Sequence, residues 1–192
     1  ALVLLLGAGS CETIELELVN DPNALNSSNA SPDFYVNAIQ LDMVEFFAGD
    51  DTFNGVSERG METTRILHMF GPLYQNAYAP SAGDFVWDKA YAGVLADVRS
   101  LAPLAEEQEL YMHLGIAQVA EAYTIATMVD TFGDVPYSES IDGISFNPVA
   151  DPGLQTYQAM HTVLDAAIAN FNKEELRKPA NDFFYGGDKD KW

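Results

Sequence analysis

Residues 131–140 read Thr-Phe-Gly-Asp-Val-Pro-Tyr-Ser-Glu-Ser, and this stretch follows a long, alanine-rich apolar segment. Gly133 has no side chain and can adopt a left-handed backbone conformation just past a helix end. Pro136 cannot continue a helix, and it restricts Val135 to an extended conformation. The stretch therefore predicts the end of a helix followed by a sharp turn.

The segment before this turn, about residues 106–129, shows the strongest helical pattern in the chain. Apolar residues lie nearly all round it, and a helix of that kind is buried. Small or apolar residues recur along one side at helical spacing, namely Gly115, Val119, Ala122, Ala126 and Val129. The small residues among them permit a neighbouring helix to approach closely.

Four other segments show the apolar periodicity of helices. They cover about 32–48, 62–70, 84–103 and 152–171. Ser31 supplies an N-cap, and Pro32 and Asp33 a first-turn proline and an early acid, to the first of them. Residues 50–60 are predicted to form a polar loop, and Pro103 is predicted to end the third helix.

The order of these segments indicates the fold class. The third and fourth helices are joined by a short loop as an antiparallel pair, and the fifth begins a further pair, which is the layout of tetratricopeptide-type solenoids. The layout alone carries this prediction, because no residue identities repeat with a period of about 34 residues. No segment alternates like a strand over more than a few residues. The sequence predicts an all-α fold of tetratricopeptide-like helical hairpins with long loops.

Composition narrows the function classes. The 192 residues are enough for one domain with its own core, and 29 acidic against 9 basic residues give a net charge of -20. Such a surface repels phosphate backbones and anionic lipid headgroups, so nucleic-acid binding is disfavoured. The simplest interpretation of the charge is solubility in an exposed, extracellular setting.

The N-terminus holds a processing pattern. Residues 1–6 are apolar, residues 7–10 are small, and Cys11 follows them as the only cysteine. This resembles the end of a bacterial lipoprotein signal peptide, which makes Cys11 the lipid attachment point and residues 1–10 the rest of the signal peptide. The alternative is a short buried strand that ends in a buried cysteine.

Residues 11–31 are predicted to form an acidic, polar tether, because they combine turn-forming residues with an acidic start. The acidic start resembles the surface-export signal of Bacteroidota lipoproteins, although an acidic solvated linker explains it equally well. With Cys11 as the anchor, the protein would contact the membrane only through its lipid. No stretch of 18 apolar residues that might span a bilayer is present.

With these segments placed, residues 129–139 closely resemble the hallmark turn of SusD/RagB-type nutrient-binding outer-membrane lipoproteins. Residues 87–95, Trp-Asp-Lys-Ala-Tyr-Ala-Gly-Val-Leu, resemble a Trp-x-x-Ala-Tyr helix of that family. Residues 147–168 resemble the segment after the hallmark turn, and residues 182–192 resemble the entry to the family's next helix. Members of the family are considerably longer, so residues 32–192 are interpreted as the N-terminal, incomplete part of a SusD-like helical domain.

The resemblance implies a function in transport. Such a protein would be anchored on the outer face of the outer membrane and would capture glycans or other nutrients. It would deliver them to a partner, a TonB-dependent, SusC-like outer-membrane transporter. Aromatic side chains in such sites stack on sugar faces.

Candidate ligand contacts are aromatic residues in or near loops. Phe53, Tyr74 and Tyr78 are the three that we select. Tyr137 and Tyr185 also stand in or near loops that suit a stacking platform, but Tyr137 belongs to the turn and is not selected as a ligand contact. The alternative for each is ordinary core or turn packing. A tetratricopeptide-type scaffold that binds a protein is the second hypothesis, and a concave groove without exposed aromatic residues would favour it.

Catalysis is not expected. Asp50 and Asp51 are adjacent and point in different directions, whereas glycoside hydrolysis needs two carboxylates that face each other across the substrate. The three histidines are far apart, and no motif for a zinc site, a nucleotide or a dinucleotide cofactor is present. We therefore expect a binding protein without a metal or cofactor.

Overall fold

The computed structural model describes residues 30–50, 54–68, 80–140, 145–174 and 177–192. The helices in these ranges are α1 (Pro32–Ala48), α2 (Val56–Thr63), α3 (Asp84–Asp88), α4 (Ala96–Glu107), α5 (Tyr111–Phe132) and α6 (Gly153–Phe171). A 3₁₀ turn, Pro80–Gly83, precedes α3, and a π-helical stretch, Lys89–Leu95, joins α3 to α4 as one rod. The described residues form no strand, only one isolated antiparallel bridge between Val135 and Asp151.

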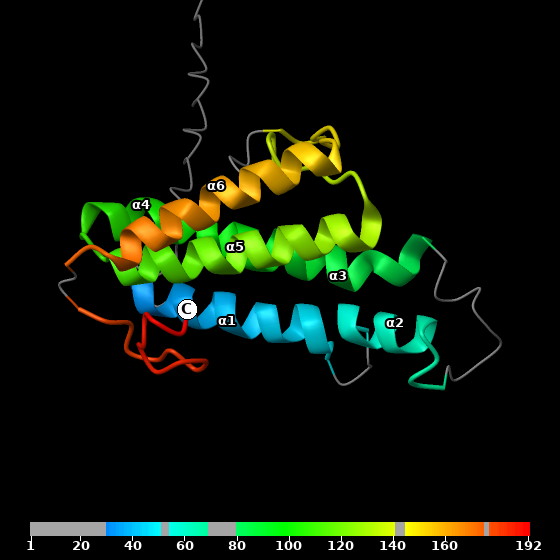
Figure 1. The fold of residues 1–192 in the computed structure, drawn as a ribbon, viewed down its shortest axis with the longest axis horizontal. Coiled ribbons are helices and arrows are strands. Elements are labelled where there is room, and N and C mark those ends of the chain that lie inside the picture. Colours follow the sequence, from blue (N-terminus) through cyan, green and yellow to red (C-terminus); the bar gives the residue numbers. More distant parts are fainter. Residues whose placement is uncertain (1–29, 51–53, 69–79, 141–144, 175–176) are drawn as a thin grey trace, which may run out of the picture.

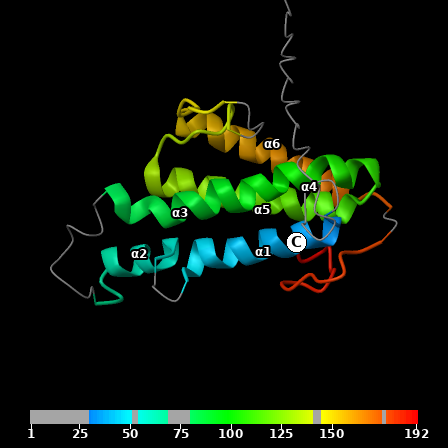
Figure 2. The ribbon, with the colours of Figure 1, turned by 180° about the vertical axis from the view of Figure 1, so that it is seen from behind.

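The α3–α4 rod, α5 and α6 pack antiparallel in chain order, whereas α1 runs parallel to α5 (Figure 1). The rod of α3 and α4 and helix α5 form the middle of the molecule, with α6 along one side and α1 along the other (Figures 1 and 2). The chain reverses between α4 and α5 and again between α5 and α6 (Figure 1). The predicted all-α fold of tetratricopeptide-like hairpins is confirmed.

Local chemistry fixes both ends of α1 as predicted. The Ser31 hydroxyl oxygen accepts a hydrogen bond from the Asp33 amide at 3.2 Å, and Pro32 occupies the first turn. Gly49 follows the last turn with φ +80°, and its amide donates to the Glu45 carbonyl. A residue with a side chain is strained at that φ.

The prediction for the second helix is wrong. It lies at Val56–Thr63, so it begins inside the predicted polar loop of residues 50–60 and shares only residues 62 and 63 with the predicted helix at 62–70, of which residues 69 and 70 lie outside the described residues. The chain leaves the helix at Thr64 and turns through Arg65, which has φ +60°. The apolar residues that suggest a longer helix are therefore not buried, and Ile66 is 73% exposed.

The third helix also continues beyond its predicted end. Pro103 lies inside α4, which ends at Glu107. The proline ring removes one backbone hydrogen bond, but Leu101 and Ala105 on either side of it are fully buried. Their burial offsets the lost bond. Helix α5 correspondingly begins at Tyr111 rather than near residue 106, after a break at Glu109 with φ +54°.

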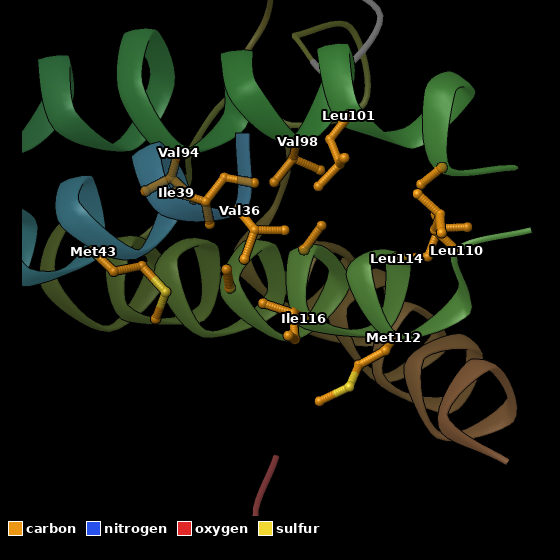
Figure 3. Close-up of a cluster of buried hydrophobic side chains, with 13 residues drawn as sticks. Val36, Ile39, Met43, Val94, Val98, Leu101, Leu110, Met112, Leu114 and Ile116 are labelled. Atoms are coloured by element: carbon orange, nitrogen blue, oxygen red, sulfur yellow. The ribbon is translucent and has the colours of Figure 1, made fainter. Parts of the chain in front are cut away.

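The largest part of the core lies between α1, the α3–α4 rod and α5. Val36 and Ile39 of α1, Val98 and Leu101 of α4 and Ile116 of α5 point toward one another there (Figure 3). Two smaller clusters continue the core toward the far end of α5 and under α6. Helix α5 takes part in all three clusters, as its apolar pattern predicts.

Gly115 shows how closely α6 approaches α5. A Cβ atom at this position would lie 2.4 Å from Cε1 of Phe171, the last residue of α6. Real Cβ atoms do not approach other atoms so closely, so the aromatic ring occupies the space that glycine leaves. The predicted close approach at the small residues of α5 is present at this position.

We expect Gly115→Ala to lower the free energy of unfolding by about 1–3 kcal/mol, because the new methyl group would displace the Phe171 ring. Gly60→Ala in α2 is the matched control, because nothing lies within 4 Å of its Cβ position. Gly60→Ala is expected to raise the free energy of unfolding by about 0.5–1 kcal/mol through helix propensity alone. Urea denaturation measures both, and a stabilising Gly115→Ala would contradict the packing described.

Candidate functional site

The turn at residues 131–140 has the backbone that its sequence predicts. Helix α5 ends at Phe132, and the Gly133 amide donates to the Val129 carbonyl at 2.8 Å. Gly133 has φ +85° and ψ −113°, a conformation open essentially only to glycine. Val135 is extended and fully buried, and its carbonyl accepts a hydrogen bond from the Asp151 amide at 3.0 Å.

Two aspartates lock the turn against the start of α6. The Asp151 carboxylate accepts hydrogen bonds from the Tyr137 and Ser138 amides, each at 2.8 Å, and from the Ser138 hydroxyl at 2.7 Å. Asp134 accepts from the amide of Gly153, the first residue of α6, at 2.8 Å. Both ends of the connection between α5 and α6 are therefore fixed.

The hydrogen bonds of the turn favour the charged form of Asp151. Burial acts to raise the pKa of Asp151, but the hydrogen bonds from Ser138 and Tyr137 outweigh it and hold the pKa below its ordinary value of 3.8. Asp151 is therefore ionised in the folded protein at neutral pH.

Tyr137 and Tyr91 fasten the turn to the helices. The Tyr137 hydroxyl donates to Oε1 of Glu121, a buried residue of α5, at 2.6 Å. The Tyr91 hydroxyl donates to the Pro136 carbonyl at 2.7 Å. Burial, supported by the neighbouring carboxylates, raises the pKa of both phenols, so both remain protonated donors. Tyr137, one of the loop aromatic residues that suit a stacking platform, holds the fold together here.

A groove lined by aromatic residues lies on another face, between α1, α5 and residues 184–192. We call it the aromatic groove, and its volume is about 410 Å³. Its lining consists of Met43, Val44, Phe47 and Ala48 of α1, Val119 and Tyr123 of α5, and Phe184, Tyr185 and Trp192. The volume lies in the range of small-ligand sites, about 300–1,000 Å³.

The rings of the groove stand in two groups. On the helix side, Phe47 and Tyr123 are stacked, with ring centroids 4.7 Å apart. On the other side, Tyr185 meets Trp192 edge to face at 5.1 Å, and Phe184 lies 5.7 Å from Trp192. Tyr123 is 56% exposed and Tyr185 42% exposed, so ring surface remains open to a ligand on both sides.

Phe184, Tyr185 and Trp192 form the second aromatic wall of the groove, and buried polar groups hold this wall against α1. The Gln40 side chain is fully buried; its Oε1 accepts from the Phe183 amide at 2.8 Å and its Nε2 donates to the Asn181 carbonyl at 3.2 Å. Asp182 accepts from Nε1 of Trp192 at 2.8 Å and from the Gly187 amide at 2.9 Å. These bonds fix the backbone and one ring of the wall.

A second set of bonds ties the same segment to the start of α1. The Asp33 carboxylate lies 3.0 Å from Nε2 of buried His113 and accepts from Arg177 at 2.7 Å and from the Ala180 amide at 3.0 Å. Burial acts to raise the pKa of Asp33, but these hydrogen bonds and the Arg177 charge lower it overall. The aromatic wall is thus anchored at two places along α1.

The sequence-predicted site residues are only partly located by the structure. Cys11, Phe53, Tyr74 and Tyr78 lie outside the described residues, as does most of the predicted tether. Tyr185 does line the aromatic groove. Phe47, Tyr123 and Trp192 were not predicted as site residues.

One signal in the sequence points to the helix side of the groove. Helix α1 is apolar on nearly all sides, yet it lies at the edge of the described structure (Figure 1). Phe34, Leu41 and Val44 of this helix are consequently exposed. An apolar pattern all round a helix at an edge indicates a surface that meets something other than water.

The fold and the groove together define a helical-hairpin protein with an aromatic surface cleft. A family model described as starch-binding, associating with outer membrane, matches residues 22–192. The chain therefore belongs to the SusD-like family, as its hallmark turn predicts.

The fold is similar to that of a solved structure. A SusD/RagB family protein from Bacteroides thetaiotaomicron VPI-5482 matches with a TM-score of 0.68 and 24% identity, over 85% of the present chain. The match spans 35% of that protein's chain. No curated protein matches the sequence. None of the helices in the described ranges is both long and apolar enough to cross a membrane.

We expect Gln40→Leu to release the second aromatic wall. The change leaves the Phe183 amide and the Asn181 carbonyl without their partner, which destabilises the protein by about 1–3 kcal/mol. Hydrogen exchange at the Phe183 amide should become faster, while α5 stays protected. Gln158→Leu on the exposed side of α6 is the control. Unchanged exchange at Phe183 would show that Gln40 does not hold the wall.

Asp151 should give the turn a measurable acid sensitivity. Its pKa is lower in the folded than in the unfolded chain, so its contribution is present above about pH 4 and disappears as the pH falls through the folded value. Asp151→Asn should therefore be less stable than the wild type at pH 7, and the difference should shrink toward pH 2. Thermal unfolding across this range measures it, and a pH-independent difference would contradict an ionic role.

Proposed function

We propose that this protein binds glycans in the aromatic groove, as a non-catalytic nutrient-capture protein at the bacterial cell surface. The observation that carries the proposal is the presence of open aromatic rings on both walls of one groove, in a chain whose family is described as starch-binding.

The chemistry of the groove suits a sugar ring. A pyranose has an apolar face of C–H groups, which packs against an aromatic ring, and hydroxyl groups around its edge that stay in contact with water. The exposed rings of Tyr123 and Tyr185 offer such surfaces, and their hydroxyls add hydrogen-bonding groups at the same place. None of the described residues that line the groove is charged, so the preferred ligand is an uncharged stretch of glycan.

The remaining parts of the proposal concern the whole protein. Cys11 carries the lipid anchor after removal of residues 1–10, and residues 11–31 form the tether. Residues 32–192 make up the N-terminal part of the SusD-like domain. Phe53, Tyr74 and Tyr78 contribute further aromatic contacts. The protein passes its ligand to a TonB-dependent, SusC-like transporter in the outer membrane.

A protein-binding scaffold is the second candidate function. The apolar lining of the groove, with Met43 and Val119 between the rings, also suits apolar side chains of a partner protein. The exposed aromatic residues favour the glycan, because a groove without them would be expected of a scaffold.

Purification of the protein from native membranes tests whether it associates with a transporter. A co-purifying TonB-dependent barrel is expected, and its absence would count against delivery of the ligand to such a transporter.

Tyr123→Ala and Tyr185→Ala should each weaken binding of a neutral oligosaccharide such as maltohexaose by about tenfold, since stacking on one ring contributes on the order of 1 kcal/mol. Isothermal titration calorimetry on the full-length protein measures the affinity. Phe146→Ala is the matched control, because this ring is fully exposed and lies outside the groove. If a panel of neutral glycans binds equally to the wild type and to both tyrosine variants, the groove is not the glycan site.

A further inference from the structure

A second cavity lies beside the turn at residues 131–140, away from the aromatic groove. We call it the Arg99 pocket, and its volume is about 430 Å³. Trp87 and Tyr91 supply ring surface to its lining, and Arg99, Ser140 and Ser145 supply polar groups. Its composition differs from that of the aromatic groove, because it combines aromatic surface with a cation and hydroxyls.

The framework of this pocket is rigid. The Trp87 ring is stacked on Tyr91 at a centroid distance of 5.3 Å and packs against Phe132 at 5.0 Å. The Tyr91 hydroxyl is bound to the Pro136 carbonyl, and Nη1 of Arg99 donates to the Ser140 carbonyl at 2.8 Å. The rings and the guanidinium are therefore held in place before any ligand arrives.

Arg99 differs from other cations of the protein in its electrostatic surroundings. Lys89 pairs with Asp42 and Glu45, and Arg177 pairs with Asp33. Among the described residues no carboxylate forms an ion pair with Arg99, although acidic residues outnumber basic ones by 29 to 9. In the part of the chain that the structure describes, only one of its five N–H donors has a partner, the Ser140 carbonyl.

Asp151, an acid near the pocket, does not serve as a counterion of Arg99. Asp151 contributes a negative charge close to Tyr91, but its two oxygens already accept three hydrogen bonds from Tyr137 and Ser138. The guanidinium is thus available to an anionic group brought by a ligand. A planar guanidinium binds a carboxylate through two parallel hydrogen bonds, which a hydroxyl cannot match.

We infer that the Arg99 pocket is a second binding site, which takes a carboxylate-bearing sugar such as a uronic acid residue. The carboxylate binds the Arg99 guanidinium, the sugar ring lies against the surface of Trp87 and Tyr91, and the Ser140 and Ser145 hydroxyls face its hydroxyl groups. The site is separate from the aromatic groove, so the protein can hold two parts of one branched or mixed glycan.

Calorimetry with trigalacturonate and with its fully methyl-esterified form tests this site on the full-length protein. The two ligands have the same sugar chain and differ at the carboxyl groups, which are charged in the acid and carry neutral methyl esters in the other form. The acid should bind at least about tenfold more tightly than the ester, as a charge-assisted hydrogen-bonded pair predicts. Equal affinities, or no binding of the acid, would overturn the inference.

Two variants assign the effect to Arg99. Arg99→Gln should remove the preference for the acid, and Arg99→Lys should retain part of it, since the charge remains but the two-pronged geometry is lost. Lys191→Gln, an exposed change of the same charge, should leave the preference intact. Wild-type affinity for the acid in Arg99→Gln would overturn the inference, and if that variant does not fold, wild-type affinity in Arg99→Lys would do so.

The same variants distinguish a wrong inference about the Arg99 pocket from a wrong assignment of the aromatic groove as the glycan site. Arg99→Gln should bind maltohexaose as the wild type does, whereas Tyr123→Ala should keep the preference for trigalacturonate. In the wild-type protein, a preference for trigalacturonate without binding of maltohexaose would therefore contradict the aromatic groove alone, and binding of maltohexaose without a preference for the acid would contradict the Arg99 pocket alone.

Discussion

Burial of α5 over most of its surface is the constraint on which the rest of the structure depends. A helix that is apolar nearly all round is stable in water only if neighbours cover each of its faces. The α3–α4 rod, α1 and α6 cover most of α5. The rod contributes buried residues to all three core clusters along α5, α1 to the first two and α6 to the third. The fit is tightest at Gly115, where a ring of α6 occupies the place of a side chain. The positions of α1 and the turn, and hence of both cavities, follow from this packing.

The same buried helix explains how far the sequence could be interpreted. Signals that act within a few residues were reliable: Ser31 and Pro32 start a helix, and Gly133 and Pro136 end one, because cap and turn chemistry needs no distant partner. Signals whose effect depends on whether distant residues bury the side chains were not reliable. Pro103 remains inside a helix because Leu101 and Ala105 beside it are buried, whereas Ile66 and Leu67 after α2 are exposed and lie outside the helix.

Most residues of the aromatic groove could not be predicted from the sequence. Phe47, Tyr123 and Trp192 are 76 and 69 residues apart along the chain, and each has the spacing or setting of an ordinary core residue. Only the packing of α1 against α5 and the bonds from Gln40 to residues 181–183 bring them to one groove. Tyr185 was accessible to prediction because it stands in a glycine-containing loop, where an aromatic ring has no helix face to fill.

Asp134 and Asp151 divide the connection between α5 and α6 into two parts: a neck, formed by residues 133–138 and 151–153, and a circuit, formed by residues 139–150. The chain leaves the neck after Ser138 and returns to it at Asp151, so the residues between them enter and leave at one closed point. A loop of this kind can change in length with little effect on the helices, because its closure entropy grows only slowly with the number of residues. Ser140, Ser145 and Pro148 of this circuit line the Arg99 pocket. A change in the length or sequence of this segment would therefore alter the lining of the Arg99 pocket while the helical framework stays the same.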